Sequence, residues 1–350
     1  MKNILVVTGT RPNIVKIAPL YHRWKTTFTN EFNLKLAHSG QHYDYEMYGS
    51  FLSDFDLPTP DFNLETKSNY VLQQIANTLY GLEKILRSNK FDAVLVVGDV
   101  NSTLAASVCA VKLHLPLFHL EAGVRSGDQS MTEEQNRRVV DAISSLHLAP
   151  TRQAQLNLNR ESIHPDSIIL VGNILAESLA GFKIKTERQS FCILTLHRPF
   201  NVDQPSQLYP ILNSIAGQID RDILFPAHPR TQKNLSQYKL PVNLKIMPPL
   251  PYPEFITKLS SCQAVITDSG GIQTEATILN TPCLTIRPNT EWVETITQGT
   301  NVLVNDLSKI SECFSLAVNK SSNSTVPEFW DDQVSLRCWK AIQNFFNTPG

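Results

Sequence analysis

Short apolar runs alternate with amphipathic stretches along the whole chain. We expect strands at residues 4–7, 34–38, 93–97, 117–120 and 146–149 in the first half, and at 168–171, 191–196, 223–225, 244–246, 264–267 and 283–286 in the second. Such alternation is typical of parallel sheets whose strands are joined by crossover helices. Because the pattern restarts near residue 170, the sequence predicts two domains.

The predicted fold class is α/β, with two Rossmann-like, doubly wound domains that face a central cleft. A chain of 350 residues is longer than one hydrophobic core usually supports, which also favours two domains. We expect the first domain at residues 1–170, the second at 171–335, and a helical tail at 336–350 that docks on the first domain. Doubly wound sheets bind their ligands beyond the carboxyl ends of the strands.

Composition and charge narrow the class of partner. The 31 Lys and Arg residues nearly balance the 32 Asp and Glu residues, so no basic excess favours nucleic acid or a membrane surface. The six cysteines form no C-x-x-C pair, the apolar run at 4–7 is too short for a signal peptide, and no run reaches membrane-spanning length. We therefore expect a cytoplasmic protein in a reducing compartment, with a small-molecule ligand.

The strongest local signal is the turn Asp268-Ser269-Gly270-Gly271, which follows the apolar run at 264–267 and opens a helical stretch. Backbone N–H groups and the helix dipole make such a turn an anion site, and glycine lets a phosphate approach the backbone closely. Glu275 lies four residues after Gly271, where its carboxylate can accept hydrogen bonds from ribose hydroxyls. Phosphate and sugar together indicate a nucleotide.

Charged and polar side chains follow most of the other predicted strands. Arg11 and Lys16 flank the helix start after the first strand, and Gln41 and His42 follow the second. The remaining strands lead to Asp99, Glu121, Glu133, Arg137, His197, His228, Arg230 and Arg287. Parallel strands bring such residues to one edge, so we expect them at the cleft.

Several familiar cofactor signatures are missing from the sequence. His197 and His228 lack the short spacing of a zinc pair, so we expect no metal site. Neither a P-loop nor a G-x-G-x-x-G motif occurs, which argues against ATP hydrolysis and nicotinamide chemistry. We expect no cofactor.

Eight motifs, taken in order, resemble the non-hydrolysing UDP-N-acetylglucosamine 2-epimerase family. They are GTRP, GQHYD, GD-x-NST, HLEAG-x-R, EE-x-NRR, LHRP, HPR and DSGGIQ-x-EA, and the resemblance runs from Gly9 to about Asn301. The resemblance implies two Rossmann-like domains of glycosyltransferase-B type and a homodimer. It also implies interconversion of UDP-N-acetylglucosamine and UDP-N-acetylmannosamine, by elimination of UDP to a 2-acetamidoglucal and its re-addition.

The same resemblance implies a role for each candidate residue. The positions that match catalytic residues of the family are Asp99, Glu121, Glu133, Arg137 and His197. The positions expected to hold the nucleotide-sugar are Arg11, Lys16, Gln41, His42, His228, Arg230, Ser269, Gly270, Gly271, Glu275 and Arg287.

Some positions depart from the family pattern, and alternatives stay open. Asn13 stands where the family commonly has Glu after GTRP, and Thr274 replaces the first acid of the usual EE pair. Related enzymes act on UDP-2,3-diacetamido sugars, a hydrolysing branch releases UDP and N-acetylmannosamine, and glycosyltransferases share the fold type. The hydrolysing branch generally carries an acidic-aromatic pair soon after GTR, and Pro12-Asn13 does not match it.

Overall fold

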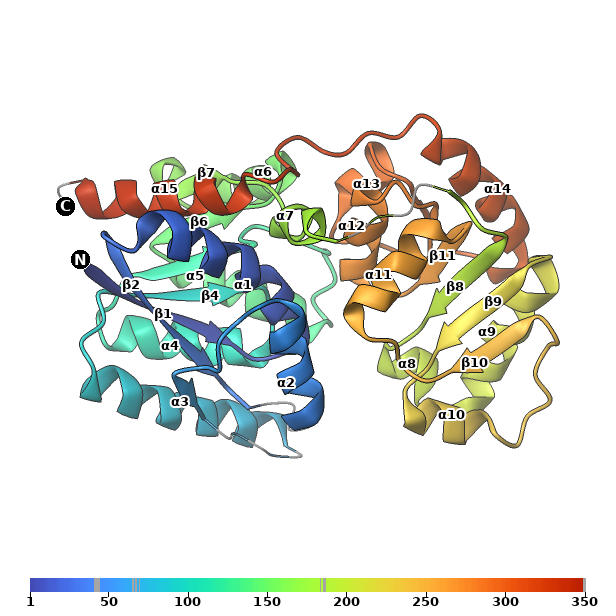
Figure 1. Cartoon of the computed structure of the whole chain (residues 1–350), viewed down its shortest axis with the longest axis horizontal. Helices are drawn as coiled ribbons and strands as arrows, with labels where there is room; N and C mark the ends of the chain where they lie inside the picture. The colour runs from blue at the N-terminus through green and yellow to red at the C-terminus, as the bar shows by residue number, and fades with distance from the viewer. Residues whose placement is uncertain are drawn as a thin grey trace. The chain divides into compact units, whose positions relative to one another are not determined.

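The computed structural model describes residues 1–40, 45–64, 66, 68, 70–182, 184 and 187–348. The chain forms two compact units, one made of Met1–Ala180 with Glu328–Gly350 and the other of Gly181–Pro327. Each unit contains a parallel sheet flanked by helices (Figure 1). The predicted fold class, two doubly wound α/β domains, is confirmed.

The sheet of the first unit has the strand order of a doubly wound domain. Across the sheet lie β3 (Phe62–Asn63), β2 (Phe32–His38), β1 (Lys2–Thr8), β4 (Ala93–Val97), β5 (Leu117–Leu120), β6 (Leu146–Ala149) and β7 (Ile168–Leu170). Neighbouring strands pair in parallel. The strand order reverses between β1 and β4, and ligands of such sheets bind at this switch point.

Helices connect these strands and cover the sheet. They are α1 (Arg11–Arg23), continued by a π-helical turn at Trp24–Phe28, α2 (Tyr45–Asp54), α3 (Val71–Ser88), α4 (Asn101–Lys112), α5 (Thr132–Ile143), α6 (Arg152–Arg160), a 3₁₀ turn at Pro165–Ser167, α7 (Ile174–Ala180) and the C-terminal α15 (Val334–Asn347). Alternate residues of β1 and β4 pack against α3 and α4: Leu5, Val7, Val94 and Val96 from the strands, and Leu82, Ala106 and Ala110 from the helices.

The second unit repeats the arrangement. Its sheet runs β10 (Leu244–Met247), β9 (Asp222–Pro226), β8 (Phe191–Thr195), β11 (Ala264–Thr267), β12 (Cys283–Thr285) and β13 (Asn301–Leu303), with the reversal between β8 and β11. The helices are α8 (Pro199–Val202), α9 (Pro205–Gln218), α10 (Pro229–Leu235), α11 (Tyr252–Ser261), α12 (Gly270–Ile278), α13 (Val293–Thr297), a 3₁₀ turn at Leu307–Lys309 and α14 (Ile310–Ser321).

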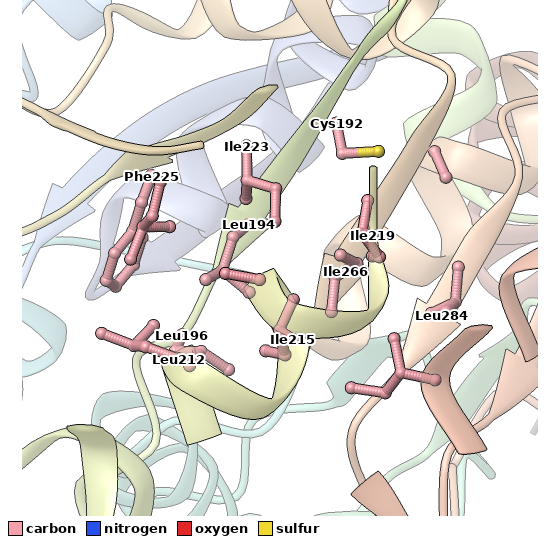
Figure 2. Packing of buried hydrophobic residues seen from close by; sticks show 14 of the residues in the cluster. Cys192, Leu194, Leu196, Leu212, Ile215, Ile219, Ile223, Phe225, Ile266 and Leu284 are labelled. Carbon is pink, nitrogen blue, oxygen red and sulfur yellow. The ribbon is translucent and has the colours of Figure 1, made fainter. Parts of the chain in front are cut away.

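Figure 2 shows how the core of the second unit holds β8 in place. Alternate residues of the strands meet one face of α9: Cys192, Leu194, Ile223 and Phe225 from β8 and β9, and Leu212 and Ile215 from the helix. All six side chains are fully buried, and each contributes about 1.5–3 kcal/mol through burial of its apolar surface. The end of β8, which leads to His197, is therefore rigidly supported.

The strand next to the predicted domain boundary belongs to the first sheet. The sequence analysis places the strand at 168–171 in the second half of the chain and ends the first domain at residue 170; β7 pairs with β6 at the edge of the first sheet. An apolar run identifies a strand without identifying its neighbour. The pattern also missed β3 and β13, whose two and three residues are too short to show a period.

The first unit is larger than the predicted range 1–170. It includes α7, where the Ser178 hydroxyl donates to the Val15 carbonyl of α1 at 2.7 Å. The chain returns to this unit at Glu328, and α15 packs against α1, α7 and β6 (Figure 1). The ring of Trp339 stacks on that of Phe32, with a distance of 5.2 Å between the ring centroids.

Candidate active site

Two carboxylates at neighbouring strand ends of the first unit each pair with a cation. Lys16 Nζ lies 2.5 Å from Glu121 Oε2, and Arg137 Nη2 lies 2.5 Å from Asp99 Oδ2. The acids follow β4 and β5, while the cations come from α1 and α5. The structure thus brings together four of the residues that the sequence singled out.

Glu121 has a backbone conformation that few non-glycine residues adopt. Its φ of 71° lies in the left-handed region, and the residue is 6% exposed. A Cβ on Gly98 would lie at the ordinary contact distance of 3.4 Å from Glu121 Oε2, so the φ of 67°, and not lack of space, favours glycine there. Glu121 Oε1 is buried and has no hydrogen-bond partner among the described residues. Strain and an unpaired buried acceptor are both typical of functional sites.

Asp99 is held in its ionised form. Burial raises the pKa of the Asp99 carboxyl, but the charges of Arg137 and Lys16 and the hydrogen bond from Arg137 outweigh it, so the pKa is lowered from its ordinary value. The side chain is 26% exposed. Asp99 is therefore an anion at neutral pH and can act as a proton acceptor.

The two adjacent glutamates at the start of α5 are placed differently. Glu134 is fully buried and accepts hydrogen bonds from Ser126 N at 2.8 Å, Gly127 N at 3.2 Å and Arg137 Nη1 at 3.0 Å. Glu133, the candidate from the sequence, is exposed. Glu134 therefore orients Arg137, whereas Glu133 points its carboxylate to solvent in this unit.

Asn13 joins the two sides of the switch point in the first sheet. Its Oδ1 accepts from Gly9 N at 3.1 Å and Thr10 N at 3.0 Å, and its Nδ2 donates to the Val97 carbonyl at 3.2 Å. A Glu at this position has no donor for Val97. Arg11, the first residue of α1, is partly exposed, and Gln41 and His42 lie outside the described residues.

In the second unit, His197 is anchored by a buried aspartate. His197 follows β8 and Asp268 follows the neighbouring β11; His197 Nδ1 lies 2.9 Å from Asp268 Oδ1. The Asp268 carboxylate also accepts from the backbone N–H groups of His197 and Arg198 and from Asn201 Nδ2. Burial raises the pKa of Asp268, but these hydrogen bonds and His197 hold it below its ordinary value.

This contact fixes which ring nitrogen of His197 carries a proton. An ionised carboxylate can only accept, so Nδ1 is the donor and Nε2 is left for other partners. The His197 side chain is 60% exposed, whereas Asp268 is fully buried. His197 therefore presents a ring of defined tautomer and orientation at the switch point of the second sheet.

The Gly-rich turn opens α12 as the sequence predicts, but its two glycines have different surroundings. A Cβ on Gly270 would lie 2.2 Å from Glu291 Oε1, so a larger residue there would require the Glu291 carboxylate to move. Gly271 faces open space, with only Ser269 Oγ at 3.9 Å. Arg287 is nearly buried and pairs with Glu291 Oε2 at 2.7 Å. The N–H groups in the first turn of α12 have no acceptor within the helix, as an anion site requires.

Glu275 is held from α11. The Tyr252 hydroxyl donates to Glu275 Oε1 at 2.8 Å. Burial and the neighbouring Glu275 carboxylate raise the pKa of Tyr252 well above its ordinary value, so the phenol keeps its proton. The other two candidates of this unit are exposed: His228 caps α10 through Nδ1, and Arg230 Nη2 lies 3.4 Å from Asp203 Oδ1.

The supporting residues were harder to find from sequence than the candidates. Asp268 heads the Gly-rich turn, and the rule that strand ends carry function could have identified it. Tyr252 lies 23 residues before its partner Glu275, and nothing in the sequence links the two. Glu134 belongs to the EE-x-NRR motif, but only the structure shows that its side chain and that of Glu291 are buried.

Within the described part of the chain, no cluster of three or more His, Cys, Asp or Glu side chains is arranged to hold a metal ion. Among the helices described, none combines the length and the apolar character that crossing a bilayer demands.

Comparisons with known proteins agree with this geometry. Residues 25–343 match the family model described as UDP-N-acetylglucosamine 2-epimerase. A Methanocaldococcus jannaschii protein named UDP-N-acetylglucosamine 2-epimerase is 37% identical, with 91% of this chain and 93% of that protein covered. A Pseudomonas aeruginosa protein named UDP-2,3-diacetamido-2,3-dideoxy-D-glucuronate 2-epimerase is 35% identical, with 86% and 88% covered.

The fold has a solved counterpart. The crystal structure of the Methanocaldococcus jannaschii UDP-GlcNAc 2-epimerase in complex with UDP-GlcNAc and UDP has a TM-score of 0.89 and 35% identity, covering 98% of this chain and 100% of that one. The predicted glycosyltransferase-B type of fold is shared with it. The match of the family model over most of the chain, together with these identities, shows that the protein belongs to the UDP-N-acetylglucosamine 2-epimerase family.

Proposed function

We propose that the protein catalyses the reversible, non-hydrolysing C2 epimerisation of UDP-N-acetylglucosamine to UDP-N-acetylmannosamine. The observation that carries the proposal is the pair of acids, Asp99 and Glu121, at adjacent strand ends, each next to a cation. Membership of the family supplies the reaction class. The substrate of the Methanocaldococcus jannaschii counterpart, seen in its complex, supports the choice of nucleotide-sugar.

The chemistry explains why two acids are needed. A base removes the C2 proton, the C1–O bond breaks, and UDP leaves with the bonding electrons while C1=C2 forms. In the return step a proton is added to C2 on the opposite face, and a UDP oxygen bonds to C1. Each general acid or base contributes about 10²–10⁴ in rate. The ionised Asp99 and the unpaired Oε1 of Glu121 support these roles.

The proposal assigns the nucleotide to the second unit. Ser269, Gly270 and Gly271 bind the diphosphate at the start of α12, and Glu275 binds the ribose. Further substrate contacts are proposed, from the family resemblance, for Arg11, Lys16, Gln41, His42, His228, Arg230 and Arg287, and catalytic roles for Glu133, Arg137 and His197. Cations near the departing diphosphate stabilise its developing charge.

Proton NMR with UDP-N-acetylglucosamine in D₂O tests the reaction. Deuterium at C2 and the appearance of UDP-N-acetylmannosamine are expected. UDP with free N-acetylmannosamine would instead establish hydrolysis. Glu121→Gln should abolish turnover and keep UDP affinity, whereas Glu83→Gln, a surface change of equal charge on α3, should leave turnover intact. Full turnover in the Glu121 variant would exclude it from the mechanism.

A diacetamido sugar is the second candidate substrate, because a relative with that name is nearly as similar as the one named for UDP-N-acetylglucosamine. The same NMR assay with UDP-2,3-diacetamido-2,3-dideoxy-glucuronate decides between them by the ratio of kcat/KM values. A larger value for the diacetamido sugar would replace the first substrate and leave the C2 chemistry unchanged.

The proposal also covers the setting of the enzyme. By resemblance to the family we expect a homodimer in the cytoplasm, and the six free cysteines suit a reducing compartment. Sedimentation analysis of the purified protein checks the dimer, and a monomer at assay concentration would remove this part of the proposal.

A further inference from the structure

The imidazole of His119 lies at the centre of a fully buried charge network. His119 is the third residue of β5 and is 0% exposed, as is Asp141 from the last turn of α5. His119 Nδ1 lies 2.6 Å from Asp141 Oδ1, and His119 Nε2 lies 2.9 Å from the carbonyl oxygen of Gly98. Both ring nitrogens therefore have a close partner in the interior.

Neither partner can donate a hydrogen to the ring. A carbonyl oxygen only accepts, and so does an ionised carboxylate. The other oxygen of Asp141 receives the Gly123 N–H at 3.0 Å and Arg125 Nη1 at 2.7 Å, which favours the ionised form. A neutral imidazole has one N–H, so one of its two short contacts would place a lone pair against another lone pair. A ring with two N–H groups satisfies both contacts.

Arg125 connects Asp141 to the surface. Its guanidinium pairs with Asp141 at 2.7 Å and with Glu161 at 2.6 Å, and Glu161 is 30% exposed and also lies 3.8 Å from Arg138. Asp141 thus has an ion-pair partner that favours its ionised form, and the protonation of His119 follows from the two acceptors that contact its ring.

This network lies directly behind the two candidate acids. Gly98, whose carbonyl contacts the ring, precedes Asp99, and Glu121 follows two residues after His119 on the same chain segment. Gly98 N also donates to the Leu120 carbonyl at 3.0 Å, so the turns after β4 and β5 are joined twice. The turn after β5 needs support, because Glu121 has a left-handed φ of 71°, whereas Gly98 adopts its φ of 67° without strain.

We propose that His119 is protonated at neutral pH and acts as a positioning residue that fixes the turns carrying Asp99 and Glu121. The protonation state stands on the geometry alone, whereas the effect on turnover rests on the proposed function. A second consequence is electrostatic. Burial, Arg137 and Lys16 have the largest effects on the pKa of Asp99. The charge of His119 has a smaller effect and lowers this pKa.

NMR of protein labelled with ¹⁵N in its histidines tests the first part without any substrate. We expect both ring nitrogens of His119 to carry protons at pH 7, with the signal assigned by its loss in His119→Gln. His147, its partner on β6, is an internal reference, because burial lowers its pKa. A neutral His119 ring at pH 7, or a proton bound to Asp141 instead, would overturn the proposal.

Variants test the second part. His119→Gln should lower kcat about 10- to 100-fold, keep UDP affinity within about 2-fold, and move the acid limb of kcat/KM to higher pH. The charged and titratable groups facing the ring are Asp141, Arg125, His147 and Asp99. The double variant with Asp141→Asn removes the buried carboxylate that has lost its contact with the His119 ring, and it should restore thermal stability without restoring kcat. Exposed His164→Gln is the control. Wild-type kcat and pH profile in the double variant would refute the positioning role.

Discussion

We expect Asp268→Asn to lower turnover by about 10- to 30-fold while the protein stays folded. In the second unit His197 Nδ1 lies 2.9 Å from the Asp268 carboxylate, which also accepts hydrogen bonds from the backbone N–H groups of His197 and Arg198. An amide of the same shape can present its NH₂ group to the ring instead of an oxygen. His197 then loses the contact that selects its tautomer, and part of the population has the wrong nitrogen protonated.

The size of the effect follows from the contact that is lost. A hydrogen bond to a charged group contributes about 1.5–3 kcal/mol, and each 1.4 kcal/mol is a factor of ten in rate. The His197 side chain is 60% exposed, so water weakens the contact and the lower part of that range applies. This gives the factor of about 10 to 30. We expect it in kcat, because the substitution leaves the proposed nucleotide contacts of α12 unchanged.

The assay is steady-state turnover of UDP-N-acetylglucosamine, with UDP affinity measured in parallel by calorimetry. Asn201→Ala is the matched control. Asn201 Nδ2 donates a hydrogen bond to the same carboxylate at 2.8 Å, and the loss of this bond leaves the contact between Asp268 and the His197 ring in place. The control should lose stability and keep kcat within about 3-fold. A folded Asp268→Asn variant with wild-type kcat would show that the carboxylate does not govern His197.

Three further predictions concern Tyr252, Asn13 and the pKa of Asp268. Tyr252→Phe removes the hydroxyl donor to Glu275 and should weaken UDP binding about 10-fold by calorimetry; an unchanged affinity would remove Glu275 from the proposed ribose site. Asn13→Asp places a carboxylate against the Val97 carbonyl and should cost about 1–3 kcal/mol, seen as a lower urea midpoint; an unchanged midpoint would contradict the bridge. The pKa of Asp268 is lowered on folding, so its stabilisation is present above the unfolded value of about 3.9 and is lost as pH falls through the folded value. Acid unfolding followed by circular dichroism should therefore be less steep in Asp268→Asn, and an identical curve would contradict the shift.

The parts of the fold that the sequence predicted are those that periodicity encodes. The apolar runs at 93–97 and 264–267 are fully buried on both faces, and each coincides with a strand, β4 and β11. Sheet membership is not encoded in this way, because β7 is identical in pattern whether it pairs with β6 or opens a new sheet. The predicted boundary at 170 followed from the point where the pattern restarts, whereas the first unit also includes α7 and extends to Ala180.

The candidate site shows the same division. Asp99 and Glu121 could be singled out because each follows a strand, and the topology then brings strand ends to one edge. Lys16 was found beside the helix start that follows the first strand, whereas Arg137, inside α5, was found through the EE-x-NRR motif. Tyr252, by contrast, is the first residue of α11 and belongs to no motif; only the tertiary packing of α11 brings its hydroxyl to Glu275. Long-range pairs of this kind leave no local pattern for a single sequence to show.

Both units solve one structural problem in the same way. At the switch point of a doubly wound sheet, two neighbouring strands send their chains to opposite faces, and the backbone groups of the two turns are left near each other. Those groups must be paired when they are buried. Asn13 does this between β1 and β4, through Gly9 N and the Val97 carbonyl, and Asp268 does it between β11 and the turn after β8.

The bridging side chain then fixes whatever stands next to it. Val97 is followed by Gly98 and Asp99, and the N–H groups that Asp268 holds belong to His197 and its neighbour. A short polar side chain suffices, because the turns are already close, and its identity is set by whether the facing groups donate or accept. Asn13 faces both kinds and needs an amide, whereas Asp268 faces only donors and needs a carboxylate. Exchange of these two residue types at either bridge should therefore displace a candidate catalytic group while leaving the apolar core of the sheet intact.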